Sequence, residues 1–445
     1  MTATLETRVA PQTTHRGKRW IQEWEPENPA FWEATGKHVA RRNLVFSILS
    51  EHIGFSVWTM WASLVLFLGP AYGFTPADKF LITTTPALVG CLVRIPYTFA
   101  VARFGGRTWT VVSAALLVIP LVATLVVLEP GVSLGTLMLV GALGGVGGGN
   151  FASSMTNINA FYPDRLKGRA LGLNAGAGNL GVAAVQLVAL LVLATAGKEH
   201  PRLLVGLYLP LVVVAAVMAW AKMDNLAHMR DDKRAIRDVM KDKHTWVMSL
   251  LYIGTFGSFI GFGFAFGQVL QVQFKSDFPT PLDAAYLTFI GPLIGSFIRP
   301  VGGWLADHLG GARVTLVNFF LMAGAASVVL VASTQHSLPL YLVGFIGLFV
   351  FSGLGNGSTY KMIPAIFKAT RPDFHEARRM AGALIGLAGA IGAFGGVLVN
   401  VAFRESFLRT GEANGAYIAF IAFYAVCVVV TWAVYLRPGR RLAGV

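Results

Sequence analysis

Long stretches of apolar residues alternate with short polar stretches along nearly the whole chain. An α-helix needs roughly 20 apolar residues to cross about 30 Å of hydrocarbon, and these stretches are of that length. We therefore predict an all-α membrane protein with twelve membrane-spanning helices. The expected spans are 44–69, 80–101, 108–128, 133–160, 168–196, 203–221, 246–272, 284–305, 313–333, 338–362, 379–402 and 416–436.

The composition excludes a soluble protein. The 445 residues are 55% hydrophobic and 13% charged, whereas soluble domains carry about 25% charged residues. So few charges cannot cover a water-exposed surface of this size. Cys91 and Cys427 both lie inside predicted spans, so neither a disulfide framework nor a cysteine-rich metal site is expected.

The basic residues indicate how the chain is oriented in the membrane. Of the Lys and Arg residues, 28 lie in the N-terminal arm, the tail and alternate loops, and 6 lie in the remaining loops. By the positive-inside rule both termini are expected in the cytoplasm, in agreement with an even number of spans. The net charge of +14 therefore orients a membrane protein and does not indicate nucleic-acid binding.

A charged linker divides the predicted spans into six and six. The expected parts are a cytoplasmic arm (1–43), a first bundle (44–221), a basic linker (222–245), a second bundle (246–436) and a cytoplasmic tail (437–445). The first span is too long for the apolar core of a cleaved signal peptide. Within the arm, Trp20–Trp32 is expected as either an amphipathic lead-in to the first span or a disordered segment.

The two six-span parts repeat short patterns at a nearly constant offset. Gly90 to Arg94 matches Gly295 to Arg299 at an offset of 205 residues. The further matches pair Gly105-Gly106 with Gly310-Gly311 at an offset of 205, and Gly149-Asn150 with Gly355-Asn356 at 206. Such parallel repeats resemble those of major facilitator transporters, whose substrate binds between the halves. The sequence therefore predicts two pseudo-symmetric six-helix bundles.

Two arginines lie inside predicted spans, Arg94 in the second and Arg299 in the eighth. An arginine at such depth costs at least ~2.5–3.5 kcal/mol. The only acidic residue within a predicted span is Glu51, so at least one guanidinium lacks a carboxylate partner there. A buried ion pair or snorkelling is the structural alternative. We favour an anion site, because the forked guanidinium can donate two parallel hydrogen bonds to a planar oxyanion.

Glu51 and the adjacent His52 are the titratable residues of the first span. Ionisable groups inside a span are functional candidates by default. Two interpretations remain open: proton coupling, or a structural or gating ion pair with a basic residue such as Lys361 near the end of span ten.

Glycine-rich stretches occupy spans five and eleven, at 168–181 and 382–396. They are not phosphate loops, because no Lys-Ser/Thr follows and no strand precedes them. Close helix packing explains most of their glycines, whereas for Asn179 packing and ligand contact are equally supported. Tyr252 and Phe256 share one helix face, but neither they nor Phe151 stand out by composition from other aromatic residues.

Several motifs together resemble the nitrate/nitrite porter family of the major facilitator superfamily, in its bacterial nitrate/nitrite transporter branch. The resemblance covers about Arg42 to Arg437. The motifs are Arg94-Ile-Pro-Tyr97, Gly148-Gly-Asn-Phe151-Ala-Ser-Ser-Met155, Gly176-Ala-Gly-Asn179-Leu-Gly181, Tyr252-Ile-Gly-Thr-Phe256-Gly-Ser-Phe-Ile-Gly261 and Gly353-Leu-Gly-Asn-Gly-Ser-Thr359.

This resemblance implies roles for individual residues. Arg94 and Arg299 would bind the anion from opposite sides, and Tyr252 would form a hydrogen bond near it. Phe151 and Phe256 would enclose it between their rings. The glycine-rich stretches would contribute Asn179, Gly386 and Gly389. The chain departs from exchanger-type relatives at Ala175 and Gly389, which stand for Gly and Ser, and at Glu51, which stands for an apolar residue; these departures bear on coupling more than on substrate.

The expected function is secondary active transport of nitrate and nitrite across the cytoplasmic membrane by alternating access. Moving one negative charge into a cell costs ~2.3 kcal/mol per 100 mV. Nitrate/nitrite exchange avoids this cost, and proton symport offsets it; both remain open, with Glu51 favouring symport. The expected partners are nitrate, nitrite, protons and membrane lipid, with a monomeric transporter, no cofactor, no metal and no nucleic acid.

Alternative functions are a carrier of another small oxyanion or an organophosphate, since paired arginines also suit phosphate, and a membrane nitrate sensor. An enzyme is not expected, because the spans contain no metal-ligand cluster, nucleophile–base pairing or cofactor fingerprint. A sensor is disfavoured because the arm and the tail are too short for a signalling domain.

Overall fold

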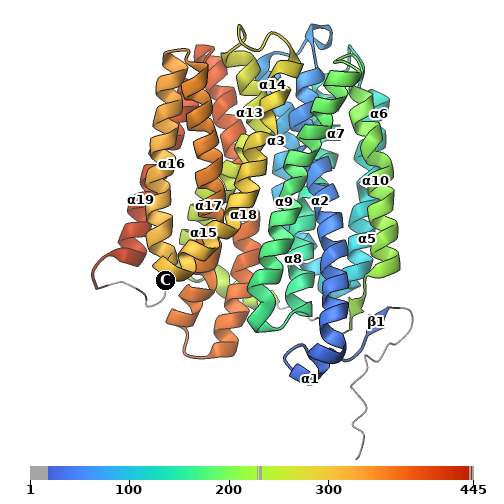
Figure 1. The fold of residues 1–445 in the computed structure, drawn as a ribbon, viewed down its shortest axis with the longest axis vertical. Coiled ribbons are helices and arrows are strands. Elements are labelled where there is room, and N and C mark those ends of the chain that lie inside the picture. Colours follow the sequence, from blue (N-terminus) through green and yellow to red (C-terminus); the bar gives the residue numbers. More distant parts are fainter. Residues whose placement is uncertain (1–18, 228, 230–232, 440–441, 443–444) are drawn as a thin grey trace, which may run out of the picture.

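The computed structural model describes residues 19–227, 229, 233–439, 442 and 445. Nearly all of these residues are helical, and long helices run side by side between the two ends of the molecule (Figure 1). Two short strands, β1 (Trp20–Ile21) and β2 (Asn225–Leu226), pair in parallel at one end. The N-terminal arm and the C-terminal residues lie at this same end, which we call the basic end.

The long helices form two halves, which lie to the right and left in Figure 1. The first half contains α2 (Lys37–Phe67), α3 (Pro76–Leu92) with α4 (Arg94–Phe104), α5 (Gly106–Leu116) with α6 (Val118–Val127), α7 (Leu134–Gly144) with α8 (Asn150–Phe161), α9 (Asp164–Thr195) and α10 (Pro201–Lys222). The second contains α12 (Lys243–Tyr252) with α13 (Ser258–Gln273), α14 (Pro281–Thr288) with α15 (Ile290–Leu309), α16 (Gly311–Thr334), α17 (Leu338–Thr370), α18 (Phe374–Thr410) and α19 (Asn414–Thr431). Shorter helices are α1 (Pro29–Phe31) in the arm and α11 (Lys233–Met240) between the halves.

The length and hydropathy of these helices agree with a multi-pass membrane protein. Within the described residues ten helices are long and apolar enough to cross a membrane, or eleven if the bent α3–α4 pair is one span. The remaining long helix, α2, has 31 residues and runs beside them. Its polar residues, Glu51 and His52 among them, lower its mean hydropathy. The predicted all-α membrane fold is confirmed.

Prolines and glycines explain where the helices break. Pro96 has no N–H to donate to the carbonyl of Leu92, and there α3 ends and α4 begins with a bend of 41°. Pro120 interrupts α5–α6 at Leu116 in the same way. A 3₁₀ turn at Gly145–Gly149 joins α7 to α8, and a π-helical turn at Ile253–Gly257 joins α12 to α13. The first of these breaks places Arg94 at the start of a helix.

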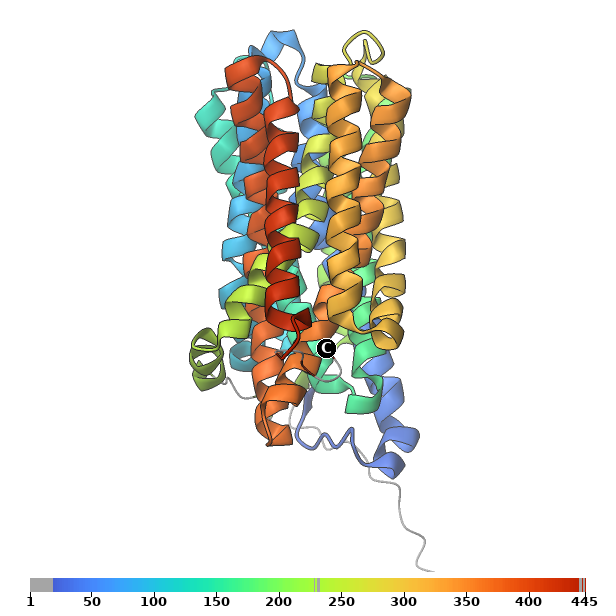
Figure 2. The same ribbon diagram turned by 90° about the vertical axis from the view of Figure 1, so that its left-hand side faces the viewer.

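The two halves pack against each other through a few helix pairs. Helix α3 packs against α18, α9 against α15, and α2 against α13. Figure 2 shows the second half from its outer side, with the orange turn between α17 and α18 projecting below the other long helices of that half. Both helices extend past the predicted spans 338–362 and 379–402, because a helix continues into water where its side chains are polar.

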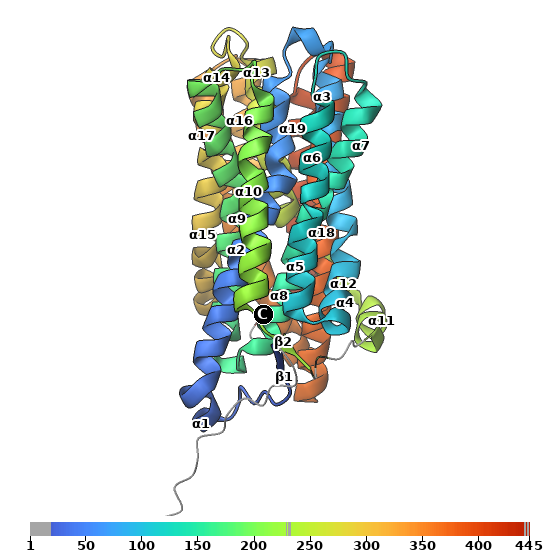
Figure 3. The same cartoon turned by 90° about the vertical axis from the view of Figure 1, so that its right-hand side faces the viewer.

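Of the predicted lead-in to the first span, only the end is helical: α1 and the π-helical turn Trp32–Gly36 run directly into α2. The arm is described from Arg19 onwards and is not a disordered segment there. It contributes β1, which pairs with β2 directly after α10, and then turns into α1 (Figure 3). Ile21, Trp32 and Leu226 are buried together with Phe161, so the arm packs beneath the first half. Residues 1–18 of the predicted arm lie outside the described residues.

Candidate functional site

Arg94 lies at the break between α3 and α4 and is completely buried. Its Nε donates to the carbonyl of Gly148 at 3.1 Å, and its Nη1 donates to the carbonyl of Gly389 at 2.8 Å. Gly389 belongs to α18, so this bond joins the two halves. Among the described residues Arg94 has no carboxylate within ion-pair distance, and its Nη2 is buried without a hydrogen-bond partner.

Aromatic rings surround the Arg94 guanidinium. Its Cζ lies 4.8 Å from the ring centroid of Phe151 and 5.0 Å from that of Phe256. Phe55 and Trp58 follow at 5.9 and 5.5 Å. Cation–π attraction lowers the cost of burying this charge without a carboxylate.

Trp58 supports Arg94 through two glycines. A Cβ on Gly90 would overlap the indole nitrogen of Trp58, and one on Gly148 would lie 2.9 Å from its Cε2. The indole Nε1 donates to the carbonyl of Pro86 at 2.7 Å, which fixes the ring. The glycine one turn before Arg94 in the repeated motif is therefore required for packing of α2 against α3.

Arg299 occupies the corresponding place in α15 and is 6% exposed. Its Nη2 donates to the hydroxyl of Tyr252 at 3.4 Å, and its Cζ lies 5.6 Å from the ring centroid of Tyr360. Its Nη1 has no hydrogen-bond partner among the described residues. Each half thus contributes one guanidinium with an unsatisfied, buried N–H.

The predicted aromatic pair lies beside Arg94 and is linked to Arg299 through Tyr252. The rings of Phe151 and Phe256, one from each half, are stacked with centroids 5.9 Å apart at an interplanar angle of 27°. Tyr252 stacks on Phe256 at 5.2 Å. The structure therefore brings together Arg94, Arg299, Tyr252, Phe151 and Phe256.

A cavity of about 580 Å³ extends from this cluster to the basic end. Arg94, Phe151, Tyr360, Gly386 and Gly389 line its inner part. A Cβ on Gly389 would lie 3.6 Å from Phe151, and one on Gly386 would lie 3.6 Å from Thr98. Arg299, Tyr252, Phe256 and Asn179 do not line it. Asn179 is buried, and both amide atoms lack a partner among the described residues.

At the opposite end, contacts between the halves close the molecule. Thr83 donates to Asn400 Oδ1 at 3.1 Å, and Gln268 donates to the carbonyl of Pro76 at 2.7 Å. The ring of Phe80 stacks on Phe403 at 5.8 Å and on Phe407 at 5.6 Å. These contacts separate the central cluster from the end opposite the arm. The cavity therefore connects the cluster to the basic end.

Glu51 is completely buried within the first half. Its Oε2 accepts hydrogen bonds from the Ser154 hydroxyl and from Asn174 Nδ2, the latter at 2.7 Å. Its Oε1 has no hydrogen-bond partner and lies against Gly178. His52 Nδ1 lies 3.1 Å from the carbonyl oxygen of Ala177.

The suggested ion pair between Glu51 and Lys361 is wrong. Lys361 is exposed and pairs with Asp307 at 2.8 Å. Both residues lie on the second half, on α17 and α15, whereas Glu51 lies inside the first half between α2, α8 and α9. The sequence correctly indicated that Lys361 lies near the basic end of span ten. It could not indicate that Asp307, on a different helix, is the acid that pairs with it.

Glu51 occupies the place in the first half that Tyr252 occupies in the second. Glu51 lies one helical turn before Phe55, and Tyr252 lies one helical turn before Phe256. Both phenylalanine rings face Arg94. Each also packs against a glycine of the glycine-rich helix of its own half: Gly178 meets Glu51, and Gly392 meets Tyr252. The repeats found in the sequence did not show that α2 and α12 are equivalent, because neither helix contains the repeated glycine and arginine motifs.

The sequence analysis missed several residues of this cluster. Trp58 and Phe55 contact Arg94, Tyr360 contacts Arg299, and Ser154 and Asn174 bind Glu51. A detectable signal was the i, i+3 spacing of Phe55 and Trp58 one turn after Glu51. Tyr360 gave no signal beyond being one aromatic residue among many.

Comparison with known proteins agrees with this architecture. The model of the Major Facilitator Superfamily matches residues 49–400. The chain belongs to the major facilitator superfamily. Because this superfamily consists of membrane transporters, the expectation of a transporter and not an enzyme is confirmed.

Relatives and solved structures refine this placement. The "Nitrate/nitrite transporter NarU" of Escherichia coli is 38% identical, over 97% of this chain and 99% of that protein. The "Probable nitrate/nitrite antiporter NarK2" of Thermus thermophilus is 33% identical, over 95% and 98%. Within the superfamily the chain thus belongs with the nitrate/nitrite porters. A D-xylose–proton symporter of known structure has a TM-score of 0.67 at 14% identity, over 88% of this chain and 97% of the other, which supports the fold alone.

Proposed function

We propose that this chain is a secondary active transporter that carries nitrate and nitrite across the cytoplasmic membrane by alternating access. The observation that carries the proposal is the pair Arg94 and Arg299, one from each half, each with a buried N–H that has no protein partner. An anion between them would satisfy both donors, which otherwise represent an uncompensated desolvation cost. The names of the relatives that match over nearly the whole chain support nitrate and nitrite as that anion.

The shape of the cluster favours a planar anion. The Phe151 and Phe256 rings are stacked with their centroids 5.9 Å apart at an interplanar angle of 27°, so they would have to separate to admit an anion, and a flat anion needs the smallest separation. A guanidinium donates two parallel N–H bonds in one plane, which suits the coplanar oxygens of nitrate. A tetrahedral, doubly charged phosphate would need a wider space and more donors. Phosphate and organophosphates are therefore the weaker candidates.

We further propose that both termini and the basic end face the cytoplasm of a bacterial inner membrane, with the transporter acting as a monomer. The excess of Lys and Arg in the loops at this end supports that orientation. The cavity would then open to the cytoplasm, with the opposite end closed by Thr83, Asn400 and the Phe80 stack. Transport requires these contacts to open while the cytoplasmic end closes.

For coupling we propose proton symport through Glu51, with nitrate/nitrite exchange as the alternative. Glu51 is a fully buried carboxylic acid of the first half. Its position is equivalent to that of Tyr252, which belongs to the central cluster. Its charge when ionised lacks an ion-pair partner among the described residues, so a proton would stabilise it there. Bound anion and proton together would also reduce the electrical cost of uptake.

The test of the substrate is counterflow of labelled nitrate in proteoliposomes of the purified protein. We expect nitrite to compete with nitrate and phosphate not to compete. Equal competition by phosphate would reject the proposed substrate in favour of a general oxyanion carrier.

The test of coupling is the same uptake with imposed pH gradients. An inward proton gradient should drive nitrate accumulation in the wild type. In Glu51→Gln, which keeps the shape and the acceptor oxygen but carries no titratable proton, accumulation should be lost while nitrate counterflow remains. Wild-type uptake that ignores the gradient and requires nitrite on the other side would support exchange instead.

A further inference from the structure

The N-terminal arm carries polar contacts that the proposed transport cycle does not use. We call its residues Arg19–Asn28 the strap. Backbone hydrogen bonds fix the start of the strap to the segment after α10: Asn225 N donates to Arg19 O at 2.8 Å, and Ala227 N donates to Ile21 O at 2.9 Å. Trp24 Nε1 donates to the carbonyl of Phe161 at 3.2 Å, so its middle is fixed to the end of α8.

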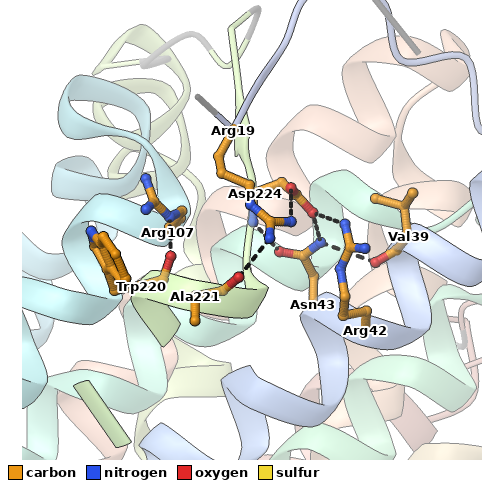
Figure 4. Close-up of polar contacts among 8 residues, drawn as sticks. All are labelled: Arg19, Val39, Arg42, Asn43, Arg107, Trp220, Ala221 and Asp224. Carbon is orange, nitrogen blue, oxygen red and sulfur yellow. Dashed lines mark hydrogen bonds and ion pairs between the residues drawn. The ribbon is translucent and has the colours of Figure 1, made fainter. Parts of the chain in front are cut away.

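A buried carboxylate strengthens this attachment. Asp224 is completely buried and receives donors from three residues, Arg42 at 2.6 Å, Asn43 at 2.9 Å and Arg19 at 3.4 Å (Figure 4). Arg19 also donates to the carbonyl of Ala221 at 2.6 Å. These partners come from the strap, α2 and the end of α10. The strap is therefore attached to the first half, and it moves with that half.

The far end of the strap reaches the mouth of the cavity. Pro26 and Glu27 line it, together with Lys167 and Arg378. Glu27 Oε1 accepts a hydrogen bond from the backbone N–H of Asp164 at 3.0 Å, which caps the first turn of α9. Pro163, the residue before this helix, offers no capping side chain.

Arg378 of the second half meets these groups. Arg378 on α18 pairs with Asp164 at 2.8 Å and lies 4.0 Å from the carboxylate of Glu27. Lys167 also pairs with Asp164, at 2.9 Å, and comes from the same helix. The two carboxylates of the first half therefore share one cation of the second half, across the mouth of the cavity.

We propose that the strap and Arg378 form a latch that restrains opening of the cytoplasmic mouth. Glu27 attracts Arg378 directly and also orders Asp164, the partner of Arg378. While these contacts persist, α18 cannot move away from α9, and the cavity stays narrow at its end. When they break, the halves separate there and the cavity opens fully to the cytoplasm. The latch depends on the arm and not on the chemistry of the transported anion.

The latch can be tested with a cysteine at Gly382, which lines the cavity and where an added Cβ meets nothing within 4 Å. The background carries Cys91→Ala and Cys427→Ala, and a bulky charged maleimide is applied to inside-out vesicles. In Glu27→Gln we expect labelling to be about two- to fivefold faster, the effect of losing a partly exposed ion pair. Glu27→Lys, which repels Arg378, should accelerate it further.

The matched control is Glu33→Gln. Among the described residues, Glu33 pairs with Lys37 of the same segment at 2.7 Å and forms no ion pair with the second half, so labelling should be unchanged. Asp224→Asn should accelerate labelling as Glu27→Gln does, because it loosens the strap and leaves Glu27 charged. Equal labelling rates in Glu27→Gln, Glu27→Lys and the control would overturn the latch. The assay needs no nitrate, so its outcome is separate from that of the proposed substrate.

Discussion

At the scale of single residues, the central feature is a pair of buried guanidinium groups that the protein itself leaves incompletely bonded. Arg94 donates to Gly148 and Gly389 and Arg299 donates to Tyr252, but Arg94 Nη2 and Arg299 Nη1 have no partner among the described residues. Native proteins satisfy most buried donors. Among the buried donors without a partner in the described residues, these two come from different halves and belong to one cluster, with Arg94 beside Phe151 and Phe256 and Arg299 bonded to Tyr252. A ligand that supplies the missing acceptors explains this arrangement.

Arg299→Lys tests whether the forked shape matters in addition to the charge. Lysine presents a compact ammonium, so it cannot donate to Tyr252 and to an anion in the same planar arrangement. A lost charge-assisted hydrogen bond is worth about 1.5–3 kcal/mol, so we expect the KM for nitrate counterflow to rise roughly 10- to 100-fold. The exposed Arg313, at the start of α16, provides the control as Arg313→Lys, with an unchanged KM. A near-normal KM in Arg299→Lys would argue against the clamp.

At the scale of helices, the sequence predicted some features well and missed others for identifiable reasons. The long apolar stretches predicted the number and order of the spans. The repeated Gly-x-x-x-Arg motif predicted that Arg94 and Arg299 occupy equivalent places in the two halves. The bend before Arg94 is caused by Pro96, which is visible in the sequence. The direction in which the bend turns the Arg94 side chain depends on the packing of the helices and is not visible there. The equivalence of Glu51 and Tyr252 could not be found, because the two side chains share no chemistry and only their glycine partners reveal it.

Contacts between distant segments were beyond the sequence for a different reason. The sequence does not indicate which acid Lys361 pairs with, and the placement of α15 beside α17 selects Asp307. Likewise, the strap consists of polar and aromatic residues whose pattern fits several structures. Its strand forms because β2 presents free backbone groups next to it. In both cases the tertiary arrangement selects one partner from several that are locally equivalent.

Gly90→Ala tests the packing of α2 against α3 that supports Arg94. The new methyl group would overlap the Trp58 indole, so the ring must leave its place beside the guanidinium. Overpacking of this kind costs about 1–3 kcal/mol. We expect a lower melting temperature for the detergent-purified protein and a higher KM for nitrate. Gly176→Ala, where a Cβ meets nothing within 4 Å, should change neither quantity. A fully active, equally stable Gly90→Ala would contradict this role.

At the scale of the whole molecule, the two ends differ in how the halves meet. The end away from the arm is closed by the Thr83–Asn400 and Gln268–Pro76 bonds and by three stacked rings. The basic end is bridged by Arg378 with its carboxylate partners and by the Arg94–Gly389 bond deeper inside. If the halves rock about the central cluster, contacts at the two ends oppose each other. Weakening either set should then shift the population towards the state in which that end is open.

Thr83→Val applies this reasoning to the end opposite the latch. Valine keeps the shape of threonine but cannot donate to Asn400, and it removes a hydrogen bond worth about 0.5–1.5 kcal/mol between the halves. The state that faces the cytoplasm should therefore become less populated, and labelling of Gly382→Cys in inside-out vesicles should slow by about two- to tenfold. Thr85→Val is the control, because among the described residues the Thr85 hydroxyl donates to the carbonyl of Ile82 in its own helix and to no residue of the second half.

The double variant Thr83→Val with Glu27→Gln tests whether the two ends are coupled. Its labelling rate should return towards the wild-type rate, because the two changes bias the same equilibrium in opposite directions. A labelling rate that does not return towards the wild-type value would mean that the two ends do not move as parts of one rocking motion.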